Sequence, residues 1–243
     1  MRPIATQSPK VSLIVPVYNE VESLAPLMAE VEAALRGVAG LEVVLVNDGS
    51  TDGSLEEMQR LRGLYPHLGL RIIDLDRNHG LTTAMDAGFR AARGEVLVTI
   101  DADLQNDPAD IPRLLSYLDS YDVAIGSRTR RRDRLVKRLS SKVANAIRNW
   151  ATEETIMDTG CSLKAYRASF VRRLKLYNGL HRFLPTMLKL EGARVIEVPV
   201  NHRPRRFGQA KYHLWNRLIG PLLDLFAVRW MQKRHLNYRM EEK

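Results

Sequence analysis

The feature that most constrains this chain is an alternation of short apolar runs with longer amphipathic segments over residues 11–126. The apolar runs are bounded by turn residues and predict buried strands, whereas the segments between them repeat apolar residues at helical spacing. The predicted strands are Val11–Val17, Leu41–Val46, Leu70–Leu75, Glu95–Ile100 and Asp122–Gly126, and the helices are Glu20–Arg36, Ser54–Leu64, Leu81–Ala92 and Ile111–Leu118. This alternation predicts an α/β fold with a Rossmann-like, mostly parallel sheet that carries helices on both faces.

The pattern changes after residue 130. Apolar residues recur about every fourth position from Leu135 to Trp150, which predicts an amphipathic helix with a basic opposite face. Further elements are expected as strands at Ser162–Tyr166 and Arg194–Val200 and as helices near Phe183–Leu190 and from His213 to about His235. The expected organisation is a tail at residues 1–10, one domain at 11–212 and a basic, amphipathic helical extension at 213–243.

The chain has 243 residues and a net charge of +9, and its positive charge is concentrated in two segments. Residues 128–148 carry +8 and residues 201–243 carry +7, so the remainder is acidic at −6. Such a distribution indicates a polyanionic partner or an anionic membrane surface. Nucleic acid is not expected, because aromatic residues make up only 7% of the chain and no nucleic-acid-binding motif is present. The apolar stretch Leu218–Trp230 is too short and too charged to span a bilayer.

Polar residues follow four of the predicted strands. In a doubly wound sheet, ligands bind beyond the carboxyl ends of the strands, so these residues are the first candidates for a site. They are Tyr18-Asn-Glu20, Asn47-Asp-Gly-Ser-Thr-Asp52, Asp101-Ala-Asp-Leu-Gln105 and Ser127-Arg128.

Asp101 and Asp103 stand one residue apart, directly after an apolar strand. Two acids at this spacing are common on protein surfaces. Here their position at the sheet edge concentrates negative charge, which is unfavourable unless a cation offsets it. Mg²⁺ and Mn²⁺ take oxygen ligands and often combine a few carboxylates with substrate phosphates. The pair therefore predicts a divalent metal site.

The segment around Asp48 has two interpretations. Asn-Asp-Gly-Ser is typical of turns, and Thr51 or Asp52 could cap a helix. Asp48 at a strand end could instead accept hydrogen bonds from a nucleobase or ribose. Tyr18 could belong to the core or form a platform on which a base stacks. Neither a Gly-x-Gly-x-x-Gly nor a Walker A loop is present, so dinucleotide and ATPase functions have no support.

Seven motifs in order resemble the inverting family of nucleotide-sugar glycosyltransferases that includes dolichol-phosphate mannosyltransferase. They are Pro16-Val-Tyr-Asn-Glu20, Asn47-Asp-Gly-Ser-Thr-Asp52, Arg77-Asn-His-Gly80, Asp101-Ala-Asp-Leu-Gln105, Gly126-Ser-Arg128, Asp158-Thr-Gly160 and Arg205-x-x-Gly208-x-x-Lys211. The resemblance implies a GT-A fold and metal-dependent transfer of a sugar from a GDP- or UDP-linked donor to a polyprenyl phosphate such as dolichyl or undecaprenyl phosphate.

The resemblance also implies roles for individual residues. Nucleotide binding would fall to Pro16, Tyr18, Glu20, Asp48 and Asp101, and the metal (Mg²⁺ or Mn²⁺) to Asp101, Asp103 and Gln105. The acceptor phosphate would meet Arg128 and Arg138, while Arg205 and Lys211 would close over the donor diphosphate. The residues expected to act in catalysis are Asp103, Asp158, Arg128 and Arg138. Ala210 departs from the family, which often has Ser or Thr before the loop lysine.

Three functions remain open from the residues. A phosphate acceptor is already ionised at neutral pH and needs no strong base. A saccharide or lipid hydroxyl acceptor would need one, and Asp158 is then the candidate, unless it only orients a neighbouring arginine. The third is a nucleotide- or polyanion-binding module without catalysis.

The expected location is cytoplasmic, on the inner face of the membrane. The last helix, with Trp215, Phe226 and Trp230, would lie in the interface or pack on its own domain or a second subunit. A homo-oligomer is left open.

Overall fold

The computed structural model describes residues 10–128, 156, 158–207 and 219–236. Its strands are β1 (Val11–Val17), β2 (Leu41–Asn47), β3 (Arg71–Asp74), β4 (Val96–Thr99), β5 (Val123–Ser127), β6 (Lys164–Arg167) and β7 (Val195–Pro199). Its helices are α1 (Val21–Leu35), α2 (Ser54–Leu64), α3 (Leu81–Ala91), α4 (Ile111–Ser116), α6 (Ala168–Val171), α7 (Leu184–Leu190) and α8 (Ile219–Arg234). Short 3₁₀ helices are η1 (Pro66–Leu68), η2 (Pro108–Asp110), η3 (Tyr117–Asp119) and η4 (Leu180–Phe183).

The strands and helices predicted within these residues are all present, with ends that differ by a few positions. The short helix α6 was not predicted. The N-terminal tail up to residue 9, the basic helix expected at 135–150 and residues 213–218 of the last expected helix, with Trp215, lie outside the described residues.

All described strands join one seven-stranded sheet in the order β3-β2-β1-β4-β6-β5-β7. Neighbouring strands run parallel except where β6 lies between β4 and β5, and it is antiparallel to both. The sheet is therefore mostly parallel, as predicted. Because β6 runs in the opposite direction, its first residue, Lys164, pairs with Thr99 at the end of β4. The start of β6 thus lies at the edge where the parallel strands end.

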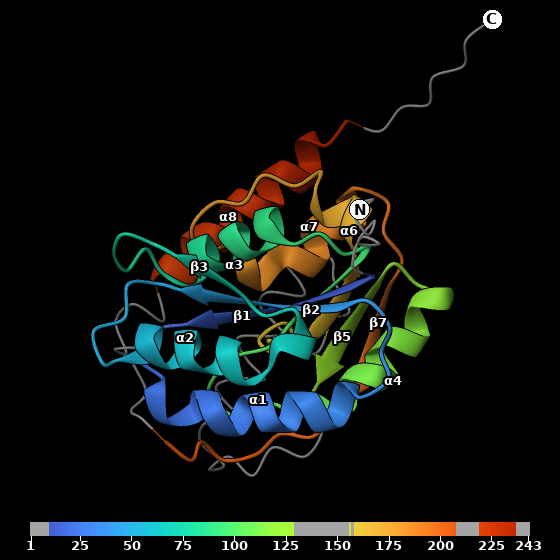
Figure 1. Ribbon diagram of the computed structural model, residues 1–243. Coiled ribbons are helices and arrows are strands. Elements are labelled where there is room, and N and C mark those ends of the chain that lie inside the picture. The colour runs from blue at the N-terminus through green and yellow to red at the C-terminus, as the bar shows by residue number, and fades with distance from the viewer. Residues whose placement is uncertain (1–9, 129–155, 157, 208–218, 237–243) are drawn as a thin grey trace, which may run out of the picture.

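Helices cover both faces of the sheet (Figure 1). One core packs α1, α2 and α4 onto the sheet, and its fully buried members include Leu24, Met28 and Leu61. The other core packs α3, α6 and α7 onto the opposite face around Tyr166 and Phe89, whose rings meet edge to face. The sheet is consequently buried on both sides, which explains why its strands read as nearly continuous apolar runs.

Helix α3 lies unusually close to β1 because Gly88 faces the sheet. A Cβ at this position would collide with the side chain of Ile14 on β1. The absence of a side chain allows the helix backbone to approach the strand, and this approach positions the N-terminus of α3 beside the end of β1.

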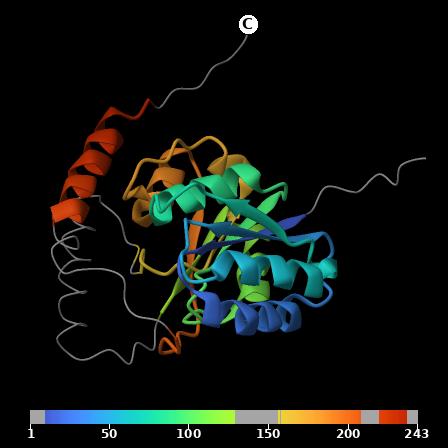
Figure 2. The ribbon, with the colours of Figure 1, turned by 60° about the vertical axis from the view of Figure 1, so that its left-hand side comes forward.

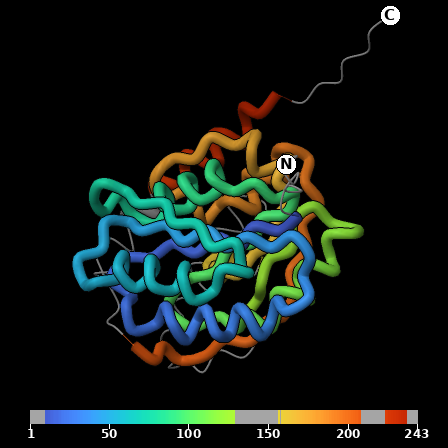
Figure 3. The backbone as a smooth tube through the Cα atoms, in the orientation of Figure 1, coloured from blue at the N-terminus to red at the C-terminus, as the bar shows by residue number. Residues whose placement is uncertain are grey.

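The C-terminal helix α8 lies outside the helices that cover the two faces of the sheet (Figure 2). Leu225 and Val228 are buried against Leu180 and Phe183 of η4, so one side of the helix packs on its own domain. After β7, the chain runs alongside α1, where Arg203 forms an ion pair with Glu30 at 2.7 Å (Figure 3). None of the helices in the described part of the chain has the length and apolar character that crossing a membrane requires.

Candidate active site

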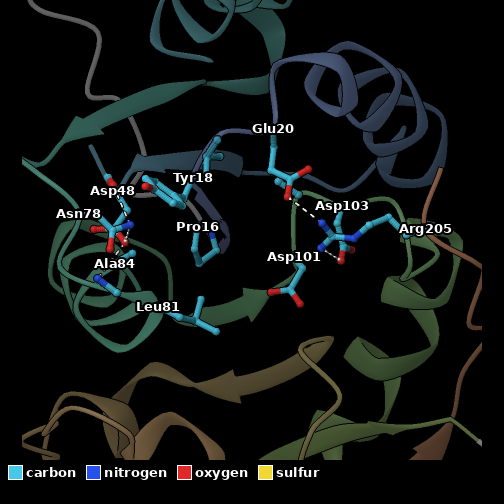
Figure 4. A pocket seen from close by; sticks show the side chains of 13 residues that line it. Pro16, Tyr18, Glu20, Asp48, Asn78, Leu81, Ala84, Asp101, Asp103 and Arg205 are labelled. Carbon is cyan, nitrogen blue, oxygen red and sulfur yellow. Dashed lines mark hydrogen bonds and ion pairs between the residues drawn. The ribbon is translucent and has the colours of Figure 1, made fainter. Parts of the chain in front are cut away.

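A cavity of about 260 Å³ opens where β1, β2 and β4 end. It brings together residues from five of the seven predicted motifs, the last of which, at Arg205, lies in the segment after β7. Its polar and charged lining is Tyr18, Glu20, Asp48, Asn78, Asp101, Asp103 and Arg205, with Pro16 among its apolar residues. Figure 4 shows Asp48 and Asn78 on one side of this first cavity and Asp101, Asp103 and Arg205 on the other.

Asp48 organises the wall of the first cavity. Its carboxylate accepts hydrogen bonds from the backbone N–H groups of His79 (2.7 Å) and Gly80 (2.9 Å) and from the Asn78 side chain (3.1 Å). Asp48 therefore holds the loop before α3 and lines the cavity at the same time. The positive φ of Gly49 (66°) belongs to this arrangement, because a Cβ there would collide with the backbone of Arg77 and Asn78.

The rest of the Asn47–Asp52 segment acts as the turn that its composition predicts. Asn19 accepts a hydrogen bond from the Thr51 N–H at 2.7 Å, and Ser50 accepts one from the Asn19 N–H at 3.0 Å. Asp52 accepts one from the N–H of Val21 in the first turn of α1 at 3.1 Å. The turn interpretation therefore holds for Ser50, Thr51 and Asp52, which contact Asn19 and the start of α1, while Asp48 lines the cavity and its predicted role toward a nucleoside stays a prediction.

Asp101 and Asp103 lie at the opposite side of the first cavity. Burial, followed by the nearby charge of Asp103, raises the pKa of Asp101 to about 6. Asp103 is buried and pairs with Arg205, whose Nη2 lies 2.7 Å from Oδ2 of the aspartate. Arg205 also reaches Glu20 at 3.5 Å. The positive charge that this carboxylate pair requires is thus supplied in part by the arginine predicted to close over the donor.

Gln105, the third predicted metal ligand, does not line the first cavity. The backbone of Gln105 forms two hydrogen bonds nearby: its N–H donates to Asp103 at 3.1 Å, and its carbonyl oxygen accepts from the N–H of Arg203 at 2.8 Å. In the described ranges, no group of three or more His, Cys, Asp or Glu side chains could hold a metal ion. An ion at Asp101 and Asp103 would therefore need oxygen atoms from a substrate or from water.

Arg128 and Asp158 form a bidentate ion pair at the end of β5. Nε and Nη2 of Arg128 each lie 2.7 Å from an oxygen of Asp158, and the Arg128 N–H donates to the same carboxylate at 3.1 Å. Both side chains are mostly buried. The carboxylate thus orients the arginine, which is one of the two roles considered for Asp158. Arg138 and Lys211 lie outside the described residues.

A second cavity of about 230 Å³ adjoins the first, and Pro16, Leu81 and Asp101 line both. Its other polar lining includes Lys164 and His181. His181 is half-buried and contacts Thr82 at 2.7 Å, and desolvation, followed by the charges of Arg182 and Lys164, lowers its pKa to about 3, so the imidazole is neutral.

Lys164 was not among the predicted site residues, because it lies inside the predicted strand Ser162–Tyr166 and not after a strand end. It is the first residue of the antiparallel strand β6 and lies four positions after the predicted Asp158-Thr-Gly160 motif. This proximity was the signal that could have identified it. Cys161 also lines the second cavity, and burial raises the pKa of its thiol to about 11, which makes it a poor nucleophile.

Comparison with known proteins identifies the family. The glycosyl transferase family 2 model matches residues 12–175. Dodecaprenyl-phosphate galacturonate synthase of Rhizobium johnstonii is 40% identical over 233 residues, which cover 93% of this chain and 68% of that protein. Undecaprenyl-phosphate 4-deoxy-4-formamido-L-arabinose transferase of Pectobacterium carotovorum is 38% identical over 219 residues, covering 89% of this chain and 66% of that protein. The chain thus spans about two thirds of the length of these relatives.

Solved structures agree with this assignment. The mannosyltransferase PcManGT from Pyrobaculum calidifontis, in complex with GDP-Man and Mn²⁺, has a TM-score of 0.67 and 25% identity, covering 91% of this chain and 64% of that one. Glucosyl-3-phosphoglycerate synthase from Mycobacterium tuberculosis, with Mn²⁺ and UDP, has a TM-score of 0.67 over 94% of this chain and 80% of that one, and at 16% identity it supports the fold alone. The predicted GT-A fold is confirmed, and the chain belongs to glycosyltransferase family 2.

Proposed function

We propose that this protein transfers a sugar from a nucleoside diphosphate sugar to a polyprenyl phosphate, with Mg²⁺ or Mn²⁺ as its cofactor. The observation that carries the proposal is the placement of Asp48 and of the carboxylates Asp101 and Asp103 on different sides of the first cavity; we assign the side with Asp48 and Tyr18 to the nucleoside and the carboxylate side to the diphosphate. The relatives that match about nine tenths of the chain are named as transferases or synthases that use dodecaprenyl or undecaprenyl phosphate.

The residues at the carboxylate side fit a divalent cation. Asp101 is largely buried and its pKa is raised, so its ionised form is unstable unless positive charge is nearby. When bound, the cation would neutralise the charge that develops on the leaving diphosphate. Asp101 and Asp103 would hold it. Arg205, which is already 2.7 Å from Asp103, would then be available for a phosphate oxygen.

The Arg128–Asp158 pair favours a phosphate acceptor over a hydroxyl acceptor. Both oxygens of Asp158 bind Arg128, so this carboxylate is poorly suited to remove a proton from a hydroxyl group. A phosphate is ionised at neutral pH and attacks without such a base. Arg128, held in place by Asp158, would position it, and Arg138 remains a predicted partner in this role.

The sugar and the base of the donor are not fixed by this geometry. The two relatives are named for galacturonate and 4-deoxy-4-formamido-L-arabinose, whereas mannose appears with the solved PcManGT. Mannose, which the sequence resemblance favoured, is therefore one candidate among several.

The exposed side of α8 supports attachment to the surface of a membrane. Leu223, Phe226 and Trp230 are between 62% and 72% exposed and follow one another at helical spacing. Lys233 and Arg234 follow in the last turn. Apolar and basic side chains together favour an interfacial position on an anionic leaflet, such as the inner face of the cytoplasmic membrane.

The membrane proposal is tested by sedimentation with vesicles that contain anionic lipid. Changing both Phe226 and Trp230 to Ser should release the protein into the supernatant. The matched control is Leu64→Ser, because Leu64 is also exposed (55%) but lies on α2. Equal binding by both variants would contradict an interfacial role for α8.

The activity is tested by incubating the protein with Mn²⁺, a panel of UDP- and GDP-sugars and a short polyprenyl phosphate. We expect a glycosyl phospholipid that is labile to acid, no product with the matching polyprenyl alcohol, and no product with Asp103→Asn. Transfer to a saccharide or lipid hydroxyl with no transfer to the phosphate would refute the proposed acceptor. Nucleotide binding that is indifferent to metal, with no transfer, would favour a binding module.

A further inference from the structure

The second cavity lies where the two substrates would meet, an argument that rests on the proposed function. It shares Asp101 with the first cavity, so it continues from the predicted diphosphate position away from the nucleoside side. With the nucleotide in the first cavity, the sugar would enter the second. The group that attacks the sugar must reach the same space.

Lys164 places a buried cation in this second cavity. Its side chain is only 4% exposed, and its Nζ donates to the carbonyl oxygen of Thr159 at 3.1 Å. No ion pair between Lys164 and a carboxylate occurs among the described residues. An ammonium group has three protons to donate, and the carboxylates of Asp158 and Asp101, which favour the charged form of Lys164 without forming an ion pair with it, offset only part of the cost of burying this charge. The position therefore suits an anionic ligand.

The turn at residues 158–160 connects Lys164 with Arg128. Asp158 binds the Arg128 guanidinium, and the next residue, Thr159, accepts the hydrogen bond from Lys164. Gly160 lines the second cavity, and a Cβ on it would lie only 3.1 Å from Nη2 of Arg128. One short turn thus contacts both cations: Lys164 lines the second cavity, and Arg128 lies directly behind Gly160 in its wall.

We propose that Lys164 binds the phosphate group of the lipid acceptor in the second cavity, together with Arg128. Burial lowers the pKa of Lys164 in the protein without ligand; Cys161, Asp158 and Asp101 partly oppose this shift, and the charge of Arg128 adds to it. An incoming phosphate would offset both effects. The other source of an anion in this cavity is a carboxylate on the donor sugar, and the kinetic test separates the two.

The test compares Lys164→Met, which keeps the length of the side chain without its charge, with Lys164→Arg and with Lys175→Met on the surface. We expect Lys164→Met to raise KM for a short polyprenyl phosphate by roughly tenfold or more, because the variant loses a charge-assisted hydrogen bond to the phosphate. KM for the donor should stay nearly unchanged. Lys164→Arg should restore most of the activity, and Lys175→Met should behave as wild type. Thermal melts check folding, and the loss of a buried charge should not lower the melting temperature.

A rise in KM for the donor alone would refute the proposal and assign Lys164 to the sugar or diphosphate. Unchanged KM values for both substrates would refute it as well. A binding measurement distinguishes failure of the proposal for Lys164 from failure of the proposed function. By calorimetry without donor, wild type should bind the short polyprenyl phosphate more tightly than the matching alcohol, and Lys164→Met should reduce this difference by roughly tenfold, while Arg128 retains the remainder. If no donor supports transfer, this result still decides whether Lys164 binds the phosphate.

Discussion

Asp101 carries a carboxyl group whose protonation should control both the stability of the metal-free protein and its affinity for metal. Burial and the charge of Asp103 raise its pKa from 3.8 to about 6. Between these values, the folded protein holds a proton that the unfolded chain has lost, so the free energy of unfolding falls as the pH rises. The shift corresponds to about 3 kcal/mol of destabilisation above pH 6.

The substitution Asp101→Asn tests this reasoning, because it removes the charge and keeps the shape of the side chain. In the presence of a chelator at pH 7.5, we expect the variant to be more stable than wild type by about 2 kcal/mol, somewhat less than the full shift because Asp101 keeps some contact with solvent. Near pH 4 the two proteins should be nearly equal. Urea denaturation at several pH values measures the difference.

The control is Asp119→Asn, an exposed aspartate that should change stability by less than about 0.5 kcal/mol at any pH. A destabilised Asp101→Asn variant at pH 7.5, or a gain that does not vary with pH, would refute the reasoning. The same protonation predicts that Mn²⁺ binding to wild type weakens by about tenfold per pH unit below pH 6, because the metal requires the ionised carboxylate. Equal affinities at pH 5 and pH 7.5, measured by calorimetry, would contradict it.

Other parts of the site give further predictions. Without nucleotide, Arg205→Met should strengthen Mn²⁺ binding by about fivefold, because Arg205 and the metal compete for Asp103 and the Arg205–Asp103 ion pair is worth about 1 kcal/mol. The same variant should weaken donor binding. A loss of metal affinity in calorimetry would contradict this. Gly88→Ala should lower the free energy of unfolding by about 1–3 kcal/mol, since its Cβ collides with Ile14, and an unchanged denaturation midpoint would be the opposing result. Asp48→Asn should raise KM for the donor more than it lowers kcat, because an amide cannot accept all three hydrogen bonds from the loop before α3.

The sheet and its helices could be predicted from the sequence because burial on both faces leaves a simple signal. A strand covered by helices on two sides has to be apolar throughout, and Val11–Val17 and Leu41–Asn47 are of this kind. The same logic located Asp48, Asp101 and Asp103, since in parallel strands the functional edge follows each strand. Their meeting in one cavity follows from the register of β1 with β2 and β4.

Contacts between distant segments could not be predicted in the same way. The ion pair of Arg205 with Asp103 joins residues about a hundred positions apart, and no local pattern records it. Lys164 was missed for a different reason, because an antiparallel strand presents its first residue to the edge where its neighbours end. In the Asn47–Asp52 segment, Asp52 contacts the start of α1, whereas Asp48 binds the loop before α3 and lines the cavity. Which of the two carboxylates this loop reaches depends on the tertiary structure and cannot be predicted from the segment itself.

The Arg128–Asp158 pair has a consequence for how such proteins diversify. The chain leaves the sheet after Ser127 and rejoins it at Lys164, and the ion pair joins two residues of the connection between these strands, Arg128 and Asp158. Because the cost of closing a long connection grows only slowly with its length, residues can be inserted or exchanged between these two anchors without disturbing strand pairing.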